Sequence, residues 1–462
     1  MAMYDIAVIG GGPAGYVSAI KGAQLGGKVI LFEKDVVGGT CLNRGCIPTK
    51  TYVMTAEYIE HIKKAASRGI INDPKTQVNM DQVVKYKAGV VKQLTDGVAG
   101  LLRSNGVEVV KGTAKMVGET KIECNGTVYE AKNTLLCGGS KAGIIPFPGV
   151  ENKNVVTSDG ILELTELPEK LVIIGGGVIG CEIATAFANF GSQVTIVEMM
   201  PRVVANLDED ISKGIDKALT KLGVKIMCGK KVEQIMDENG KTYVVASGEK
   251  VEASKILLSI GRVADLECLG TLADRIQQNR GKVVVDDYMR TTIPNIYAPG
   301  DINGRIMLAH PAFKMGEAAA SCCMGKMVKA DLSKVPSCVY TLPGASSVGL
   351  TEAKAKEQYG DDLLIGRFPF SGNGRALASG STEGFVKVIA EKKYGEILGV
   401  HMFGGDATEM ISEAASLMAM EITVNEAADI IHSHPTCSEA FMEACADALG
   451  ECIHLPAKKK KK

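Results

Sequence analysis

The sequence lacks an excess of charge of either sign. Its 52 lysine and arginine residues face 53 aspartate and glutamate residues, so the formal net charge is −1. This balance gives no support for nucleic-acid binding as the main role, because that role requires a basic surface. The chain also lacks a basic segment before its first apolar run, MAMYDIAVIGGG, and no uninterrupted apolar stretch is long enough to span a bilayer. We therefore expect a cytoplasmic protein with no membrane span.

The cysteines lack the pattern of a disulfide framework. Thirteen is an odd number, and most of them are scattered through apolar segments, as Cys181, Cys322 and Cys445 are. Reduced, buried thiols of a cytosolic protein explain that distribution best.

One segment departs from the balance of positive and negative charge, the run from Lys458 to Lys462. We expect a solvated tail or an expression scar there, with a handle for an acidic partner as the alternative.

One motif is present twice. Each copy has an apolar strand-like run, a glycine-rich turn with GxGxxG spacing, a helical stretch and a second strand-like run that ends in glutamate. The glycines permit a tight turn and let backbone N–H groups approach a pyrophosphate, and the glutamate can accept hydrogen bonds from ribose hydroxyls. Each residue of the second copy follows its counterpart by 165 positions: Gly10, Gly12, Gly15 and Glu33, then Gly175, Gly177, Gly180 and Glu198. The sequence therefore predicts two sites for nucleotide-containing molecules.

The second copy also indicates the choice of nicotinamide. Glu198 would repel a 2′-phosphate, and only Arg202 follows closely enough to attract one. NAD(H) is therefore favoured over NADP(H).

The remaining segments have clear periodicity. Residues 55–103 are helical in pattern, and residues 107–137 alternate as strands do. From about residue 338, strand-like segments are followed by three helical stretches without a nucleotide motif, which suggests a separate α+β domain. The predicted fold class is α/β, with two Rossmann-like dinucleotide-binding domains and a C-terminal α+β domain.

Cys41 and Cys46 share the short segment GGTCLNRGCIPTK, which ends at Lys50. A structural zinc site would require a second pair of similar spacing, which is missing, so no metal site is expected. Inert thiols are another possibility, although the segment is polar and rich in glycine. A redox-active disulfide fits best. Arg44 lies between the two cysteines, and we expect a helix to begin near Thr49; a cation and a helix N-terminus both stabilise a thiolate.

A second candidate site lies near the C-terminus, in HSHPTCSEAFMEACADALG. Thr436 and Glu439 match a capping box, which by itself would be a structural feature. Because Cβ bonds in a helix tilt toward its N-terminus, Glu439 would also point back at His434. A carboxylate there can orient the ring and stabilise its protonated form, which makes His434 a candidate acid/base. We find no such partner for His432 in the sequence and interpret it as structural.

Together these motifs resemble those of a known family. IGGGPAGY, GGTCLNRGCIPTK, IIGGGVIGCE, TTIPNIYAPGD and HSHPTCSE are similar to motifs of the flavoprotein disulfide reductases, and among these of the dihydrolipoyl dehydrogenases. The resemblance covers nearly the whole chain and implies FAD in the first Rossmann unit and NAD in the second. It also implies a C-terminal interface domain that forms a homodimer. The implied boundaries are 1–145 and 269–337 for the two parts of the FAD-binding domain, 146–268 for the NAD-binding domain and 338–462 for the interface domain.

The resemblance implies roles for the two thiols and the histidine. Cys41 would exchange with lipoyl sulfur, and Cys46 would face the flavin. His434, oriented by Glu439, would deprotonate the incoming dithiol at the disulfide of the other subunit. The implied reaction oxidises a dihydrolipoyl group with NAD+, and the electrons pass from dithiol to disulfide to flavin to nicotinamide.

The resemblance also implies residues that hold the flavin. Lys50 and Glu182 would lie beside its ring, while Glu33 and Asp301 would bind ribose and ribityl hydroxyls of FAD. The implied partner is a lipoyl-bearing protein of a 2-oxo acid dehydrogenase, glycine cleavage or acetoin cleavage complex. The alternatives are another NAD(P)H-dependent reductase of the glutathione reductase type, or a protein that is mainly a docking subunit.

Overall fold

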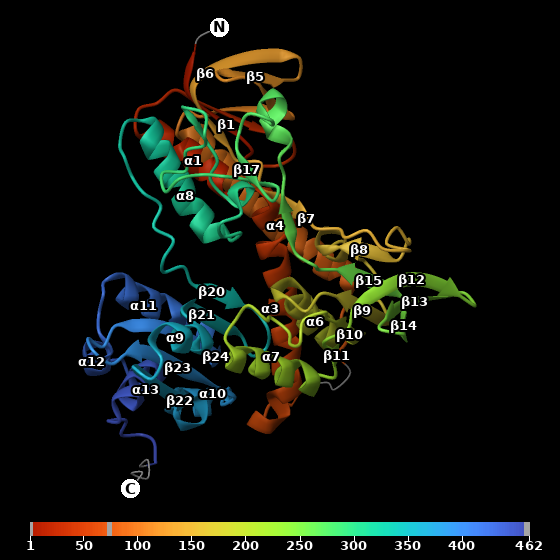
Figure 1. Cartoon of the computed structure of the whole chain (residues 1–462). Coiled ribbons are helices and arrows are strands. Elements are labelled where there is room, and N and C mark those ends of the chain that lie inside the picture. The colour runs from red at the N-terminus through yellow and green to blue at the C-terminus, as the bar shows by residue number, and fades with distance from the viewer. Residues whose placement is uncertain (1–2, 72–75, 457–462) are drawn as a thin grey trace.

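A computed structural model describes residues 3–71 and 76–456 of the chain. It has three units, each built around one large sheet (Figure 1). The prediction for Lys458 to Lys462 falls outside the described residues. Over the described ranges, no helix is both long enough and apolar enough to cross a membrane.

The first unit is centred on a seven-stranded sheet in the order β3-β2-β1-β6-β5-β4, with β19 paired to β6. Its parallel part joins strands that are far apart in the sequence, and β4, β5 and β6 form an antiparallel meander. The strands are β1 (Tyr4–Ile9), β2 (Val29–Glu33), β3 (Glu108–Lys111), β4 (Ala114–Gly118), β5 (Lys121–Cys124), β6 (Thr127–Leu136) and β19 (Ile296–Tyr297). The helix α1 (Pro13–Gln24) follows β1, and α8 (Ala309–Cys323) packs on it. At their contact a Cβ on Gly316 would lie 2.5 Å from the carbonyl oxygen of Ala14, so only glycine allows this approach.

The second unit has a five-stranded parallel sheet in the order β11-β10-β9-β15-β8. Its central strands carry buried runs such as LVII, because a parallel sheet is covered on both faces. The strands are β8 (Val155–Thr157), β9 (Lys170–Ile174), β10 (Gln193–Val197), β11 (Lys225–Met227) and β15 (Lys255–Leu258), and the main helices are α6 (Val178–Phe190) and α7 (Glu209–Lys221). A small antiparallel sheet lies beside it, with β12 (Val232–Glu238), β13 (Lys241–Ala246) and β14 (Glu249–Ala253).

The chain enters and leaves the second unit side by side. β7 (Ser140–Ala142) pairs antiparallel with β16 (Arg262–Ala264), so the outgoing and returning segments form one ribbon. The remaining short elements are α5 (Ser158–Ile161), β17 (Gln278–Asn279), β18 (Lys282–Val283) and the 3₁₀ turns η1 (Ala65–Arg68), η2 (Glu267–Leu272), η3 (Asp301–Asn303) and η4 (Phe370–Gly372).

The third unit has an antiparallel sheet in the order β20-β21-β24-β23-β22. The strands are β20 (Ser337–Val339), β21 (Ala345–Gly349), β22 (Leu363–Pro369), β23 (Gly384–Glu391) and β24 (Ile397–Gly404). The helices are α9 (Glu352–Tyr359), α10 (Gly374–Ser379), α11 (Ala407–Ala419), α12 (Val424–Asp429) and α13 (Glu439–Leu449). The three helices expected after the strands are α11, α12 and α13, whereas α9 and α10 lie between strands and were not expected. The predicted fold class is confirmed.

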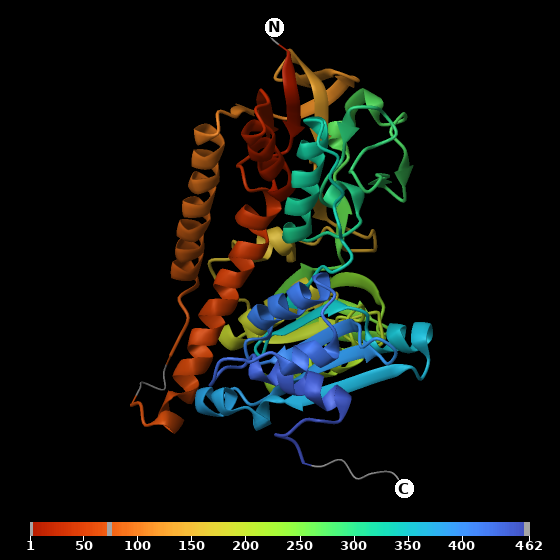
Figure 2. The same ribbon diagram turned by 90° about the vertical axis from the view of Figure 1, so that its left-hand side faces the viewer.

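Two long helices connect the units. α3 (Cys46–Lys64) and α4 (Met80–Ser104) run from the first unit along the side of the molecule, and α3 reaches past the second unit toward the third (Figure 2). The ring of Tyr52 on α3 lies 6.1 and 5.9 Å from the rings of Phe187 and Phe190 on α6, and its hydroxyl donates to the carbonyl of Leu162 at 2.9 Å. This contact holds the thiol-bearing helix of the first unit against the nucleotide helix of the second.

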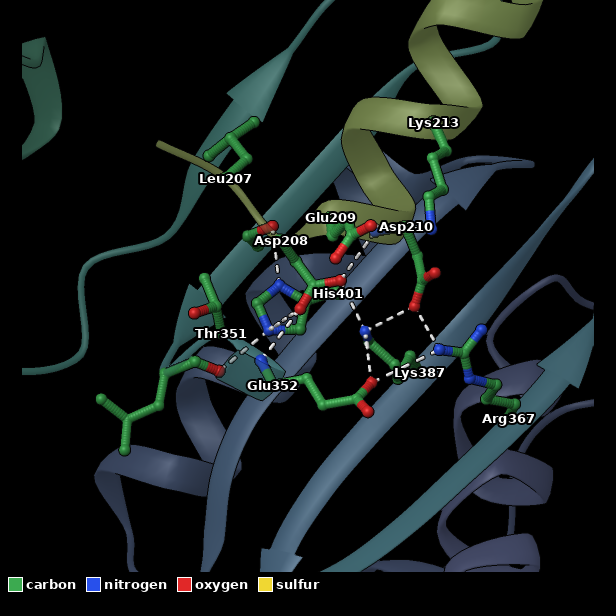
Figure 3. Close-up of polar contacts among 12 residues, drawn as sticks. Leu207, Asp208, Glu209, Asp210, Lys213, Thr351, Glu352, Arg367, Lys387 and His401 are labelled. Carbon is green, nitrogen blue, oxygen red and sulfur yellow. Dashed lines mark hydrogen bonds and ion pairs between the residues drawn. The ribbon is translucent and has the colours of Figure 1, made fainter. Parts of the chain in front are cut away.

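A cluster of charged and polar side chains around the buried Lys387 joins the second and third units (Figure 3). We call it the Lys387 cluster; its members are Asp208, Asp210, Glu352, Arg367, Lys387 and His401. The ammonium of Lys387 is 1% exposed and donates to Asp208, to Asp210 at 2.7 Å and to Glu352 at 3.0 Å. A lysine so deeply buried requires such partners, because an unpaired charge there would be strongly destabilising.

Candidate active site

The two glycine-rich turns have the same backbone geometry. Gly10 and Gly175 have φ values of +102° and +108°, which side chains rarely adopt. A Cβ at Gly10 would lie 2.2 Å from the carbonyl oxygen of Cys137, and one at Gly175 would lie 2.5 Å from that of Ser259. Both positions therefore require glycine for conformation and for space.

The helices after these turns begin at glycines. Gly12 and Gly177 are the N-cap residues of α1 and α6, and no side chain within residues 3–71 and 76–456 caps either helix. A Cβ at Gly15 or Gly180 would lie 1.8 or 2.1 Å from the carbonyl oxygen of the first glycine in the same turn, so helix and strand are in close contact. Free N–H groups at a helix N-terminus suit an anion such as pyrophosphate. Both turns therefore fit a dinucleotide.

The two acids at the strand ends make matching hydrogen bonds. Glu33 accepts from the backbone N–H of Gly11 at 2.7 Å and from the N–H two residues after itself at 2.8 Å. Glu198 accepts from Gly176 at 2.6 Å and from the N–H two residues after itself at 2.6 Å. Each carboxylate thus braces its glycine-rich turn and keeps further acceptor capacity. Hydrogen bonding of these acids to ribose hydroxyls stays a prediction.

Arg202 is held by its own loop. Its guanidinium donates to the carbonyl of Ala205 at 2.9 Å and to that of Leu207 at 3.2 Å. Arg202, the one cation considered as a partner for a 2′-phosphate, is therefore already hydrogen-bonded to backbone carbonyls.

The thiol segment is more helical than its composition suggested. Cys41 lies in a short helix, α2 (Gly39–Arg44), and Cys46 is the first residue of α3. The expected helix start near Thr49 is wrong by three residues. Pro48 is accommodated because the first turn of a helix has N–H groups without intrahelical acceptors. Cys46 therefore occupies the positive end of a long helix.

The two thiols are free and have opposite acidities. The pKa of Cys46 falls to about 7, mainly because the Cys41 thiol hydrogen-bonds to its thiolate; desolvation opposes this shift and the Lys50 ammonium adds to it. The same hydrogen bond, together with burial, raises the pKa of Cys41. At neutral pH Cys46 is therefore about half ionised, and the negative charge of the pair is centred on Cys46 when it is present.

The cation that acts on the thiols is Lys50, not Arg44. Arg44 forms an ion pair with Asp35 on the surface, whereas Lys50 lowers the pKa of both cysteines. The expectation that Arg44 stabilises the thiolate is therefore wrong. The position of Arg44 between the two cysteines in the sequence does not determine the direction of its long side chain.

All three units meet at Lys50. Its ammonium donates to both carboxylate oxygens of Glu182 on α6, at 2.9 and 2.7 Å, and Glu182 is 3% exposed. Tyr340, just after β20, donates its backbone N–H to Glu182 at 3.0 Å and places its ring 4.4 Å from the Lys50 ammonium. The expected pairing of Lys50 with Glu182 is present. Tyr340 was missed, because no local pattern marks it.

Asp301 belongs to a polar chain that sequence reasoning also missed. Its carboxylate accepts from the hydroxyl of Ser140 at 2.5 Å, and Arg262 donates to that hydroxyl at 2.8 Å. Arg262 also donates to Thr40, next to Cys41, at 3.2 Å. Burial raises the pKa of Asp301. The β7–β16 ribbon thus links Asp301 to the thiol segment, while binding of ribityl hydroxyls by Asp301 stays a prediction.

His434 and Glu439 form the expected pair. Nδ1 of His434 is 2.9 Å from Oε1 of Glu439, and Oε2 of Glu439 accepts from the N–H of Thr436 at 2.9 Å. Only half of the capping box forms, because the hydroxyl of Thr436 donates to the carbonyl of Ser433. His434 is 76% exposed, and among the described residues no hydrogen bond joins it to either thiol.

The interpretation of His432 as lacking a carboxylate partner is wrong. Its Nε2 lies 2.6 Å from Oε1 of Glu413 on α11, nineteen residues earlier in the chain. A partner on another helix cannot be inferred from local spacing.

Known proteins share these features over nearly the whole chain. The family model described as pyridine nucleotide-disulphide oxidoreductase matches residues 4–316, and its dimerisation domain matches residues 335–445. A dihydrolipoyl dehydrogenase of Bacillus subtilis (strain 168) is 41% identical over 457 residues, which cover 97% of this chain and 99% of that protein. A dihydrolipoyl dehydrogenase of Thermus scotoductus is 39% identical over 464 residues, with coverage of 98% and 99%.

A solved structure has the same fold. The HOCl-induced flavoprotein disulfide reductase RclA from Escherichia coli superimposes with a TM-score of 0.87 at 29% identity, and the match covers 96% of this chain and 99% of that one. The duplicated nucleotide turns, the thiol pair at the start of α3 and the matched family models lead to one conclusion. The chain belongs to the pyridine nucleotide-disulphide oxidoreductase family.

Proposed function

We propose that the protein is a dihydrolipoyl dehydrogenase, which oxidises the dihydrolipoyl group of another protein to its disulfide and reduces NAD+ to NADH. The observation that carries the proposal is the convergence at Lys50. There Lys50, which lowers the pKa of both thiols of the first unit, binds Glu182 of the second unit and lies beside the ring of Tyr340 of the third. The curated relatives at 37–41% identity carry the same name over almost their full length.

FAD and NAD(H) are the cofactors of this family, and the chain fits both. The first turn, with Gly10, Gly12 and Gly15, would hold the FAD pyrophosphate, and the second turn, with Gly175, Gly177 and Gly180, would hold that of NAD. Bound FAD supplies two-electron transfer between the thiols and the nicotinamide. Lys50 would stabilise negative charge beside it, and Glu33 and Asp301 would contact its hydroxyl groups. Glu198, together with the engaged Arg202, supports NAD over NADP.

The thiol chemistry follows from the unequal acidities. When Cys41 and Cys46 form a disulfide, a thiolate of the dihydrolipoyl group attacks Cys41 sulfur and displaces Cys46 as the better leaving thiolate. The second lipoyl thiolate then attacks the lipoyl sulfur of this mixed disulfide, which closes the lipoyl ring and releases Cys41. Two electrons remain on the cysteine pair, and two protons leave the substrate.

The substrate protons require a base, and His434 has the right orientation. Glu439 holds Nδ1 and leaves Nε2 directed away from the pair and able to take a proton. Because His434 is exposed in the single chain and the third unit matches a dimerisation domain, we place it at the thiols of a second copy in a homodimer.

The partner and compartment follow from the same chemistry. A lipoyl-bearing protein of a 2-oxo acid dehydrogenase, glycine cleavage or acetoin cleavage complex would deliver the substrate. The scattered, buried cysteines away from the active pair, such as Cys181 and Cys445, agree with a cytoplasmic, reducing setting. A glutathione-type reductase would use NADPH and would require a free arginine where Arg202 is engaged.

Steady-state kinetics test the proposal. Purified protein should be yellow. It should reduce NAD+ rapidly when dihydrolipoamide is the thiol substrate. It should reduce NADP+ far more slowly, whether the thiol substrate is dihydrolipoamide or glutathione. His434→Gln should lower dihydrolipoamide turnover by roughly 10² or more while NADH-to-dye activity persists, because the dye bypasses the thiol step. A colourless protein, or equal loss of both activities, would contradict the proposal.

A further inference from the structure

Two histidines of one short segment have opposite surroundings. The side chain of His434 is 76% exposed, whereas that of His432 is 5% exposed. His432 lies between α12 and α13, and its ring is held on two sides. Nδ1 is 2.8 Å from the carbonyl oxygen of Ile430, and Nε2 is 2.6 Å from Oε1 of Glu413 on α11.

These two partners determine the protonation of the ring. A carbonyl oxygen and a carboxylate oxygen only accept hydrogen bonds, so both ring nitrogens must donate. The proton lies on His432 and not on Glu413, because imidazole is a stronger base than a carboxylate. The hydrogen bond with Glu413 accordingly raises the pKa of His432, although burial opposes the shift. The ring is therefore an imidazolium at neutral pH.

His401 provides a contrast within the same unit. It is also buried, and its Nε2 lies 2.9 Å from the carbonyl oxygen of Leu350. Its Nδ1, however, lies 2.9 Å from the hydroxyl of Ser347, which can donate to a neutral ring. Burial lowers the pKa of His401. The charge on His432 thus comes from its carboxylate partner and not from its position in the interior.

The charge of His432 acts on the proposed catalytic pair, His434 and Glu439. His432 interacts electrostatically with Glu439, the carboxylate whose Oε1 lies 2.9 Å from Nδ1 of His434. The charged groups that face His432 are therefore Glu413 from α11 and Glu439 from α13. An imidazolium at this position opposes the effect by which Glu439 stabilises protonated His434.

We propose that His432 is a positioning residue for His434: a buried imidazolium, clamped by Glu413, that anchors the segment leading to His434 and offsets part of the negative charge of Glu439. The inference rests on the proposed function, because it takes His434 as the base. A base that must accept a proton from one lipoyl thiol and release it in every cycle works best when its pKa is near the working pH. Glu439 holds the ring of His434 through Nδ1, and the charge of His432 offsets part of the negative charge of that carboxylate.

Substitutions that change the charge of His432 or Glu413 test this inference in the FAD-loaded, full-length protein. The measurement is the acid limb of kcat/KM for dihydrolipoamide as a function of pH. His432→Gln leaves Glu413 unopposed and should move the acid limb up by roughly half to one pH unit, which lowers kcat/KM on that limb by about three- to tenfold. The double variant His432→Gln/Glu413→Gln removes both charges and should reverse at least half of that shift. NADH-to-dye activity should stay within about twofold throughout.

Two further variants separate charge from packing. His432→Lys keeps a cation that can pair with Glu413, so its acid limb should remain near that of the wild type even if its urea midpoint falls. His61→Gln removes the exposed histidine of another His–Glu pair, with Glu57 at 3.9 Å, and should change neither quantity. An unmoved acid limb in His432→Gln, with activity falling only as stability falls, would overturn the inference.

A spectroscopic measurement keeps this inference distinct from the proposed function. NMR of protein with ¹⁵N-labelled histidine should show signals from six histidine rings. The signals that disappear in His432→Gln belong to His432. Both nitrogens of His432 should be protonated at pH 7.5, when an ordinary exposed histidine is neutral. A neutral His432 would overturn the inference whatever the enzyme oxidises. A charged His432 in a protein without dihydrolipoamide turnover would instead contradict the proposed function.

Discussion

The ammonium of Lys50 is bound by both carboxylate oxygens of Glu182, at 2.9 and 2.7 Å, across the boundary between the two nucleotide units. Lys50 lies one helical turn after Cys46 on α3, and Glu182 lies in the second turn of α6. The pair therefore connects the thiol helix directly to the helix that would receive the NAD pyrophosphate. Both residues also act on the acidity of Cys46, in opposite directions.

This relationship predicts opposite effects of two substitutions on thiol reactivity. Glu182→Gln removes a negative charge that raises the pKa of Cys46, so alkylation of the reduced protein should begin below pH 7. Lys50→Met removes a positive charge that lowers it, so alkylation should require a higher pH. The pH dependence of iodoacetamide labelling measures both shifts. Glu60→Gln, which breaks a pair with Lys64 on the same helix, is the matched control. Shifts in the same direction for both variants would contradict the assignment.

The two thiols should also differ from each other. Cys46, with a pKa of about 7, is half ionised at neutral pH, whereas Cys41 stays protonated. Cys41→Ala removes the hydrogen bond that stabilises the Cys46 thiolate, so the pKa of the remaining thiol should rise by roughly one unit or more. Spectrophotometric thiolate titration near 240 nm would register that rise. A remaining thiol that still titrates near pH 7 would show that Lys50 and the helix end suffice without Cys41.

The choice of nicotinamide should depend on Glu198. Glu198→Gln removes the charge that would repel a 2′-phosphate, so the ratio of kcat/KM for NAD+ to that for NADP+ should fall by about tenfold. Arg202 stays bound to the carbonyls of Ala205 and Leu207, so a complete reversal is not expected. Glu249→Gln, an exposed residue paired with Lys230, should leave the ratio unchanged. An unaltered ratio in the Glu198 variant would remove the argument for NAD preference.

Stability should depend strongly on the Lys387 cluster. Lys387→Met leaves Asp208, 2% exposed, without its ammonium partner, so the free energy of unfolding should fall by about 3–5 kcal/mol. Lys356→Met breaks an exposed pair with Glu352 and should cost less than about 1 kcal/mol. Urea unfolding midpoints compare the two. Equal midpoints would mean that packing alone holds the second and third units together.

The same cluster predicts how stability changes with pH. Burial would raise the pKa values of Asp208 and Glu352, but their cationic partners outweigh it, so the pKa of Asp208 is lowered and that of Glu352 falls to about 2. A carboxyl whose pKa is lower in the folded state stabilises the fold above its unfolded value, near 4, and loses that contribution as the pH falls toward its folded value. The wild type should therefore lose stability between about pH 4 and pH 2 more steeply than Asp208→Asn. Parallel acid-unfolding curves would contradict this assignment.

The sequence by itself determined the features that depend on local spacing. Gly10 and Gly175 are required by a backbone conformation that a few consecutive residues specify, and Glu33 and Glu198 brace those turns from the next strand of the same unit. The pairing of Glu439 with His434 likewise follows from the direction of Cβ bonds over one helical turn. These contacts are short-range, so a pattern of residue types at fixed intervals suffices to predict them.

Tertiary structure decided which side chains meet from different elements. Arg44 turns to Asp35 and leaves the thiols to Lys50, and Tyr340 reaches Glu182 from a sheet that begins more than 150 residues later. Glu413 likewise reaches His432 from another helix, which makes a buried cation of a histidine that local sequence marks as merely structural. Long side chains can point in several directions, and only the packing of helices and sheets selects one. For that reason the sequence identified the reacting groups, whereas the fold set their charges.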